Sequence, residues 1–205
     1  MKRLLFLLAS FFICAGAGAA DVAPDLLVKN VTNEVLDLVR QDKDIRSGNT
    51  QKTLDLVEAK VLPHFNFVRM TQLALGREGR QASPEQLNVL VNEFRNLLVR
   101  TYSKALTEYR DQKISFKPFS MDAADTDVKV RSEIKQSGGK PISLDYYLEK
   151  IPAGWKVYDV EVGGVSLVTN YRTAFSQEIR ANGIDGLIRS LQAKNKTTEP
   201  AAKAK

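Results

Sequence analysis

The residues with the clearest capacity for chemistry are a serine and a histidine. Ser166 stands where an expected strand, ending in Gly163-Gly164, passes into an expected helix. A serine at such a junction is the nucleophile of the α/β-hydrolases, whose elbow has the pattern G-x-S-x-G so that strand and helix can approach closely. Here residues 164–168 read GVSLV, and a β-branched valine replaces the second glycine. We therefore predict that Ser166 caps the helix that follows it.

His64, the single histidine of the chain, lacks the partners that catalysis or metal binding requires. Elbow hydrolases place their histidine after the serine, whereas His64 precedes Ser166. The single cysteine, Cys14, lies in the N-terminal leader and cannot complete a thiolate–histidine zinc site. The sequence has no P-loop, no G-x-G-x-x-G and no isolated carboxylate within an apolar run. We predict no catalytic residue, no metal site and no cofactor, and a protein that is not an enzyme.

The first twenty residues have the pattern of a secretory signal peptide. Lys2 and Arg3 form a positive start, residues 4–13 are an apolar run too short to span a bilayer, and small residues follow up to Asp21. An uncleaved anchor would need a longer apolar run. We expect residues 1–20 to be removed on export, which leaves a mature chain without cysteine and hence without a disulfide.

The charge balance argues against nucleic acid as a partner. The chain has 30 basic and 24 acidic residues, a formal net charge of +6. The basic residues are mixed with acidic ones, whereas a nucleic-acid face would gather them into a stripe with aromatic residues. We therefore predict no nucleic-acid partner, and we interpret the charges as solvated surface.

Helical periodicity occupies the first half of the mature chain. A first helix with Asp25 as its cap, a second capped by Asn49 or Thr50, and a third at residues 66–75 carry apolar residues at helical spacing. Ser83-Pro84-Glu85-Gln86 is a capping box with proline at the first helical position, and it opens a long helix to about residue 111.

Alternation with a period of two then predicts four antiparallel strands. They fall at residues 113–119, 127–136, 142–151 and 155–162, before helices at 167–181 and 184–192. In the last strand the phase changes, which places Trp155 and Val157 on one face and Tyr158, Val160 and Val162 on the other. The fold class is α+β: N-terminal and C-terminal helices packed on one face of a curved four-stranded antiparallel sheet.

The expected organisation is one domain at residues 21–193 and a disordered polar tail at 194–205. Taken together, the predicted strands and helices carry a surplus of apolar residues. They either fill an ordinary core, or they line an apolar cavity where helices and sheet stand apart, and periodicity does not separate the two readings.

The sequence resembles the toluene-tolerance (MlaC-like) family, the periplasmic phospholipid carriers of the Mla lipid-transport pathway. The resemblance covers nearly the whole mature chain and rests on these segments: GWKVYDV at 154–160, GVSLV at 164–168, NYR at 170–172 with Phe175, NGIDGLIRSL at 182–191, VLPHFNF at 61–67, LALG at 73–76, and ASPEQ at 82–86 with Phe94 and Tyr102. One departure is Gly79, where the family usually has an aromatic residue before Arg80.

The resemblance implies a cone-shaped fold that holds the tails of a phospholipid between helices and sheet, with the lipid as cargo. It implies a periplasmic location and two partners: an outer-membrane lipoprotein–porin complex and an inner-membrane ABC transporter with an MCE-domain ring. Such a shuttle would serve outer-membrane lipid asymmetry and solvent tolerance. The residues expected to line or border the pocket come from the inner faces of the enclosing elements: Met70, Leu73, Phe94, Leu98, Tyr102, Leu144, Tyr146, Val165, Leu167 and Tyr171.

Two other functions stay open at the level of sequence. A related cone-shaped enzyme acting on an apolar small molecule would need an ionisable group inside the apolar face. A periplasmic chaperone or adaptor would show a filled core with an exposed apolar patch.

Overall fold

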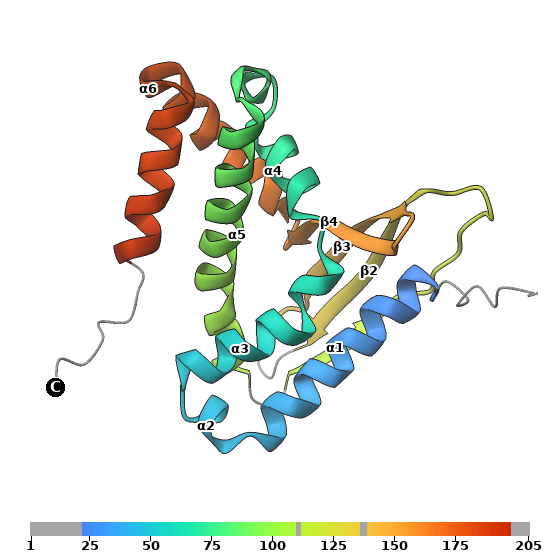
Figure 1. Cartoon of the computed structure of the whole chain (residues 1–205). Coiled ribbons are helices and arrows are strands. Elements are labelled where there is room, and N and C mark those ends of the chain that lie inside the picture. The colour runs from blue at the N-terminus through green and yellow to red at the C-terminus, as the bar shows by residue number, and fades with distance from the viewer. Residues whose placement is uncertain (1–21, 110–111, 136–138, 198–205) are drawn as a thin grey trace, which may run out of the picture.

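The protein folds into one antiparallel sheet and a group of helices, one of which lies along the sheet while most of the others stand beside it (Figure 1). The computed structural model describes residues 22–109, 112–135 and 139–197. The elements in chain order are α1 (Pro24–Gln41), α2 (Lys43–Arg46), α3 (Thr50–Lys60), η1 (Leu62–His64), α4 (Phe67–Leu75), η2 (Glu78–Gln81), α5 (Pro84–Thr107), β1 (Lys113–Phe116), β2 (Asp127–Lys135), β3 (Ile142–Ile151), β4 (Gly154–Val162), β5 (Val165–Ser166) and α6 (Leu167–Thr197).

Local capping explains where the long helices begin. Ser83 accepts a hydrogen bond from the Gln86 backbone N–H at 3.2 Å, and the Gln86 side chain accepts one from Ser83 at 2.9 Å, which confirms the predicted capping box. Asn49 caps α3 by accepting from the Lys52 N–H. The prediction for α1 was wrong by two residues: Ala23 is the N-cap and makes no side-chain bond, because Pro24 already fixes the first turn.

The five strands form one antiparallel sheet in the order β1-β2-β3-β4-β5. Four of them were predicted, and the fifth is the two-residue strand β5, which pairs with the end of β4 across the Gly163-Gly164 turn. Both glycines have positive φ, 58° and 85°. That backbone conformation suits glycine, and it lets β4 turn back within two residues.

A β-bulge in β4 corrects the predicted change of face. The register shifts between Tyr147 and Leu148 of β3, so that Leu148 pairs with Val157 and Tyr147 pairs with Asp159. Tyr158 is therefore the extra residue. Because one residue is skipped, Trp155, Val157 and Val160 all join one core cluster on the same face. The predicted change of face was therefore wrong for Val160 and Val162, whereas Tyr158 does lie outside this cluster.

One face of the sheet, here called the inner face, carries the sheet core. This cluster comprises Val28 of α1 with Val130, Leu148, Trp155, Val157 and Val160 of the strands. Helix α1 lies along this face beside β2 (Figure 1). The outer face carries charged residues such as Lys129, Glu133 and Asp145, as the alternation predicts.

The helices have a core of their own, here called the helical core. It joins α4, α5 and α6 through fully buried side chains that include Met70, Leu90, Phe94 and Leu191. A third cluster joins α1, α2 and the end of α5. Within the described residues of the helical and sheet cores, Phe65 is the one side chain that packs against both. The two main cores therefore do not merge.

The helices and the sheet meet along β4. The Asn66 N–H donates to the Val157 carbonyl at 2.8 Å, and Tyr158 packs against the helical core. Arg69 of α4 adds an ion pair to Asp127 at 3.2 Å, and its guanidinium lies 3.6 Å from the centroid of the Tyr158 ring. These contacts fix β4 and the start of β2 to α4.

Helix α6 is bent at Gly183, whose φ of 70° is outside the helical range. The break is where the sequence predicts it. The predicted start of the tail was wrong, since helix continues to Thr197: the buried Asn195 donates to the Glu93 carbonyl at 2.9 Å and to its carboxylate at 2.7 Å, which ties the last turns to α5. The rest of the predicted tail lies outside the described residues.

The predicted signal peptide also lies outside the described residues. Within residues 22–109, 112–135 and 139–197, no helix combines the length and hydrophobicity that crossing a membrane requires.

Candidate functional site

The serine at the strand–helix junction is engaged in a cap. The Ser166 hydroxyl accepts a hydrogen bond from the Thr169 N–H at 3.0 Å and donates to the Asp159 carboxylate. The other oxygen of that carboxylate accepts from the Val160 N–H at 2.8 Å and the Val168 N–H at 3.1 Å. Asp159 thus ties β4 to the first turn of α6. The capping role of Ser166 is confirmed.

His64 lies in η1, at the opposite end of β4 from Ser166. Its electrostatic neighbours are Lys156 and Glu34, whereas those of Ser166 are Asp159 and Thr169. Across the part of the chain that the structure describes, no group of three His, Cys, Asp or Glu side chains is arranged to hold a metal ion. The geometry gives Ser166 a structural role.

The environment of His64 predicts a pH effect on stability. Burial lowers its pKa first, the Lys156 charge lowers it further, and Glu34 opposes them. The folded state therefore favours neutral imidazole, so this contribution to stability is complete above the unfolded pKa of about 6.5 and is lost as the pH falls towards the folded pKa. When the pH is lowered from about 7.5 to 5, the melting temperature of the wild type should fall by more than that of a His64→Gln variant. Equal losses in thermal unfolding would contradict this.

The inner face of the sheet is packed at one end and open at the other. Leu148 and Val157, paired across β3 and β4, are buried. Val130 and Val160, the two cross-strand partners of Tyr146, are buried as well. Towards the other end, Ile114, Ile134 and Ile142 are aligned across β1, β2 and β3 and are all half-buried. The apolar face is therefore incompletely covered where β2 and β4 end.

One row of cross-strand partners shows this change most clearly. It crosses all five strands through Phe116, Ser132, Leu144, Val162 and Val165, each paired with the next. Direct cross-strand partners project from the same face of a sheet. Ser132 is 2% exposed, Leu144 is half-buried, and Val162 and Val165 reach 38% and 56%. The row runs from the sheet core to solvent without a charged residue.

The helices show a similar gradient. The apolar stripe of α5 is fully buried at Phe94 and Leu98, but Tyr102, one turn further on, is 40% exposed. Its hydroxyl interacts with that of Tyr171 on α6, and burial, followed by that contact, raises the pKa of Tyr102. Tyr102 and the half-buried Tyr171 thus mark the end of the helical core.

Tyr146, in the middle of the inner face, has a strongly desolvated phenol. Burial raises its pKa to about 12, and a hydrogen bond with Thr32 of α1 acts in the opposite direction. Its side chain still has accessible surface, since the residue is half-buried. A ring that is surrounded by protein and yet incompletely covered is suited to contact an apolar ligand.

The structure divides the ten predicted pocket residues into three groups. Met70, Phe94 and Leu98 are buried in the helical core, with Leu73 and Tyr171 packed against it. Leu144, Tyr146 and Leu167 pack against the sheet core. Tyr102 and Val165 are exposed. The strand register also aligns Val162 with Val165 and with Leu144, an alignment that is not visible in any single strand.

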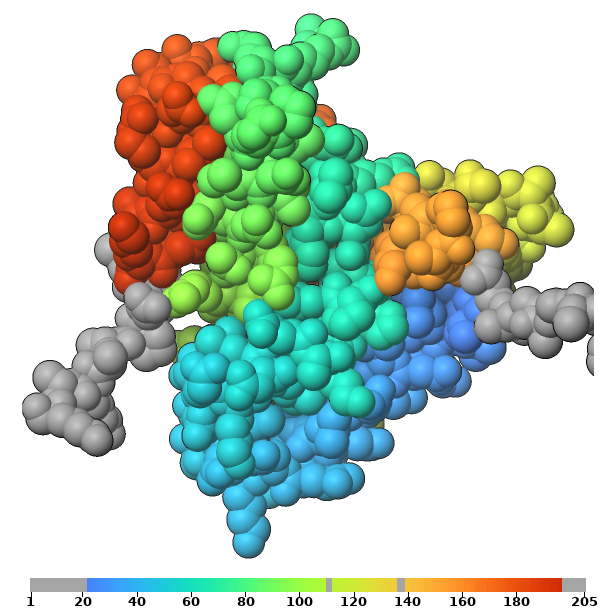
Figure 2. All heavy atoms as spheres, in the orientation of Figure 1, coloured from blue at the N-terminus to red at the C-terminus, as the bar shows by residue number. Residues whose placement is uncertain are grey.

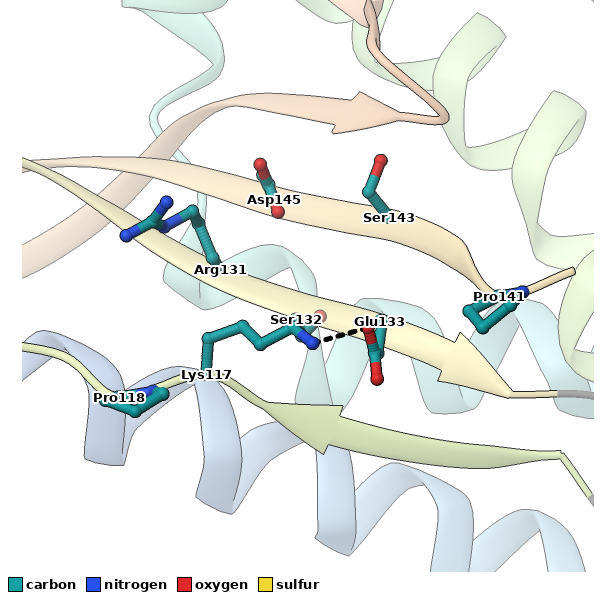
Figure 3. Close-up of a pocket in the computed structure, with 8 residues that line it drawn as sticks. All are labelled: Lys117, Pro118, Arg131, Ser132, Glu133, Pro141, Ser143 and Asp145. Atoms are coloured by element: carbon teal, nitrogen blue, oxygen red, sulfur yellow. Dashed lines mark hydrogen bonds and ion pairs between the residues drawn. The ribbon is translucent and has the colours of Figure 1, made fainter.

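A pocket of about 540 Å³ lies on the outer face of the sheet (Figure 3). Its walls include Lys117, Arg131, Glu133 and Asp145. Glu133 is paired with Lys117, and this contact lowers the pKa of its carboxyl. Such charged walls do not suit acyl chains. Another pocket, of about 300 Å³, lies between α3 and α5 and is lined mainly by threonines, Ser103, Arg100 and Lys104.

The side of the molecule seen in Figure 2 is closed over the helices. The side chains of α3, α4 and α5 meet there in a nearly continuous surface. At Gly79, in the turn after α4, a Cβ atom would lie 2.7 Å from the Cβ of the buried Leu75. The aromatic residue usual in the related family would therefore require this turn to move, and here the turn packs directly on α4.

Comparison with known proteins gives one family and several relatives. The family model described as "MlaC protein" matches residues 29–193. The chain is similar to the toluene tolerance protein ttg2D of Pseudomonas putida, with 27% identity over 90% of this chain and 84% of that protein. It is also similar to the intermembrane phospholipid transport system binding protein MlaC of Haemophilus influenzae, with 26% identity over 92% and 89% of the two chains.

A solved structure is similar in fold as well as in sequence. It is a phospholipid-binding protein from Ralstonia solanacearum in complex with a phospholipid. The TM-score is 0.79 and the identity 41%, covering 85% of this chain and 97% of that chain. The α+β arrangement of helices and antiparallel sheet predicted from the sequence is therefore confirmed.

Proposed function

The chain belongs to the MlaC family, and from that premise we propose that it is a phospholipid-binding carrier that shuttles lipid between membranes. The observation that carries the proposal is the pair of unmerged cores. The sheet core and the helical core each leave apolar side chains incompletely covered, Leu144 and Tyr146 on one side and Tyr102 and Tyr171 on the other. An apolar ligand between the two cores would cover these side chains on both sides.

The thermodynamics of the cargo require such an enclosure. Each methylene moved from water into an apolar site gains about 0.8 kcal/mol, so a diacyl lipid with roughly thirty methylenes would need on the order of 24 kcal/mol to enter water. A carrier must therefore keep the tails dry. It needs apolar walls that match a bilayer in affinity, and it needs no catalytic residue. The use of Ser166 as a helix cap agrees with a protein that is not an enzyme.

We propose that the lipid tails lie between the sheet and α5–α6. Leu144, Tyr146, Leu167 and Tyr171 would contact them. Met70, Leu73, Phe94 and Leu98 would form the wall behind, since these side chains belong to the helical core or pack against it. Tyr102 and Val165 would stand at the rim, because both are exposed.

The location and partners are part of the same proposal. The leader-like residues 1–20 support export, and a relative named as an intermembrane phospholipid transport binding protein supports a shuttle. We place the protein in the periplasm. Its partners would be an outer-membrane lipoprotein–porin complex and an inner-membrane ABC transporter with an MCE-domain ring.

Native mass spectrometry of the purified protein, with organic extraction of the same sample, tests the carrier function. We expect one diacyl phospholipid to co-purify per chain and to disappear after extraction. A chain that carries no phospholipid, and takes none up from vesicles, would contradict the proposal.

The headgroup should have little effect on affinity. Burying an unpaired phosphate costs far more than burying methylenes, so the phosphate should stay at the mouth. No basic residue interrupts the inner-face positions from Val128 to Ile134 and from Ile142 to Leu148. Phosphatidylethanolamine and phosphatidylglycerol should therefore bind within about tenfold of each other, a window of about 1.4 kcal/mol. Competition between equal amounts measures this, and a preference of about a hundredfold would reveal a specific headgroup site.

A further inference from the structure

The turn between β4 and β5 exposes apolar residues at the open end of the inner face. Val162 and Val165 face each other across Gly163 and Gly164. They are 38% and 56% exposed, and a Cβ atom added to either glycine would meet no heavy atom within 4 Å. The tip of this hairpin, here called the VGGV tip, is therefore a bare apolar projection.

Exposed valines are ordinary when they are isolated, but these two continue an interior surface. Val162 pairs with Leu144, and Leu144 pairs with the buried Ser132, all on the inner face. On the other side of the tip, Leu167 packs against the sheet core. A path of apolar side chains thus leads from solvent at Val165 to the middle of the sheet.

This path also lacks charge. Residues 162–171 contain no Asp, Glu, Lys or Arg, in a chain in which 26% of residues are charged. The nearest carboxylate along the chain, Glu161, lies opposite Asp145 on the outer face, where it accepts a hydrogen bond from the Tyr147 hydroxyl at 2.7 Å and pairs with Lys129. A methylene group crossing the tip would meet no ion that must be desolvated.

We propose that the VGGV tip is the threshold over which the acyl chains of the cargo enter and leave the pocket. Val162 and Val165 would hold the leading methylenes while they pass between the inner face and the bilayer or membrane complex that donates or accepts the lipid. The conformational freedom of the two glycines would let the tip adjust to the passing chains. The inference rests on the proposed carrier function and adds to it the route of exchange.

The test is a transfer experiment with the full chain loaded with a fluorescent phospholipid and mixed with phosphatidylcholine vesicles. A Val165→Asp variant should keep its loaded lipid but transfer it about tenfold more slowly or worse, because a carboxylate would have to be desolvated at the threshold. The matched control is Val68→Asp, since Val68 on α4 is similarly exposed at 48% but belongs to neither core. That variant should transfer at the wild-type rate.

Val165→Thr, which keeps the shape of the side chain, provides a second variant should the aspartate disturb folding; it should slow transfer several-fold. A folded Val165→Asp or Val165→Thr variant that transfers lipid at the wild-type rate would overturn the proposed role of the VGGV tip. An equal slowing of transfer by Val68→Asp would overturn it too. If the wild-type chain takes up no phospholipid at all, the carrier function itself fails, and the two failures are therefore distinguishable.

Discussion

Replacing Leu144 by tryptophan should lower the phospholipid affinity about fifteenfold while the protein stays folded. Leu144 lies half-buried on the inner face, between Ser132 and Val162. An indole there would occupy space that we assign to the tails. If it excludes two methylenes, the loss is about 1.6 kcal/mol, which corresponds to the fifteenfold change. The measurement is lipid stoichiometry by native mass spectrometry over a titration with vesicles.

The control for this substitution is Val89→Trp. Val89 is exposed on α5 and belongs to neither core, so an added indole there should leave lipid affinity unchanged. Leu98→Trp is less suitable, because Leu98 is already enclosed in the helical core and a larger side chain would destabilise the fold. An unchanged lipid stoichiometry in a folded Leu144→Trp variant would contradict the assignment of Leu144 to the pocket.

Replacing Asp159 by alanine should lower the free energy of unfolding by about 2–3 kcal/mol, because hydrogen bonds to a charged group are stronger than neutral ones. Its carboxylate accepts from the Val160 and Val168 N–H groups and from the Ser166 hydroxyl. Its loss would free the first turn of α6 from β4. Chemical denaturation of both proteins measures the difference.

Ser166→Ala is the matched comparison for Asp159→Ala. It removes the cap on the Thr169 N–H but leaves the two backbone contacts of Asp159, so the expected loss is about 1 kcal/mol. This variant should still bind phospholipid, whereas loss of lipid exchange with an intact fold would point to chemistry at Ser166. A loss of stability from Asp159→Ala no larger than that from Ser166→Ala would contradict the bridging role of Asp159.

Features that depend on neighbouring residues could be predicted from the sequence. The capping box at Ser83 and the break at Gly183 each arise from a few consecutive residues, and the structure has both in place. The alternation in β2 and β3 also identifies the inner face correctly, because one face of each strand is apolar over many positions.

Features that depend on distant residues could not be predicted. The bulge at Tyr158 is defined by its pairing with β3, and without that register the change of phase indicated a change of face. The helical end at residues 194–197 depends on the contact of Asn195 with Glu93, about a hundred residues away. The openness of the inner face likewise depends on how α1 and α5 are placed, which no periodicity specifies.

The position of the single tryptophan of the chain has a spectroscopic consequence. Trp155 is buried in the sheet core, whereas most helical residues pack in the other clusters. Its fluorescence therefore reports the unfolding of the sheet, whereas far-UV circular dichroism mainly reports the unfolding of the helices. In a lipid-free chain the two signals can change at different denaturant concentrations, because the cores share few contacts. A lipid bound between the cores would link them, so the two transitions should move together to a higher denaturant concentration.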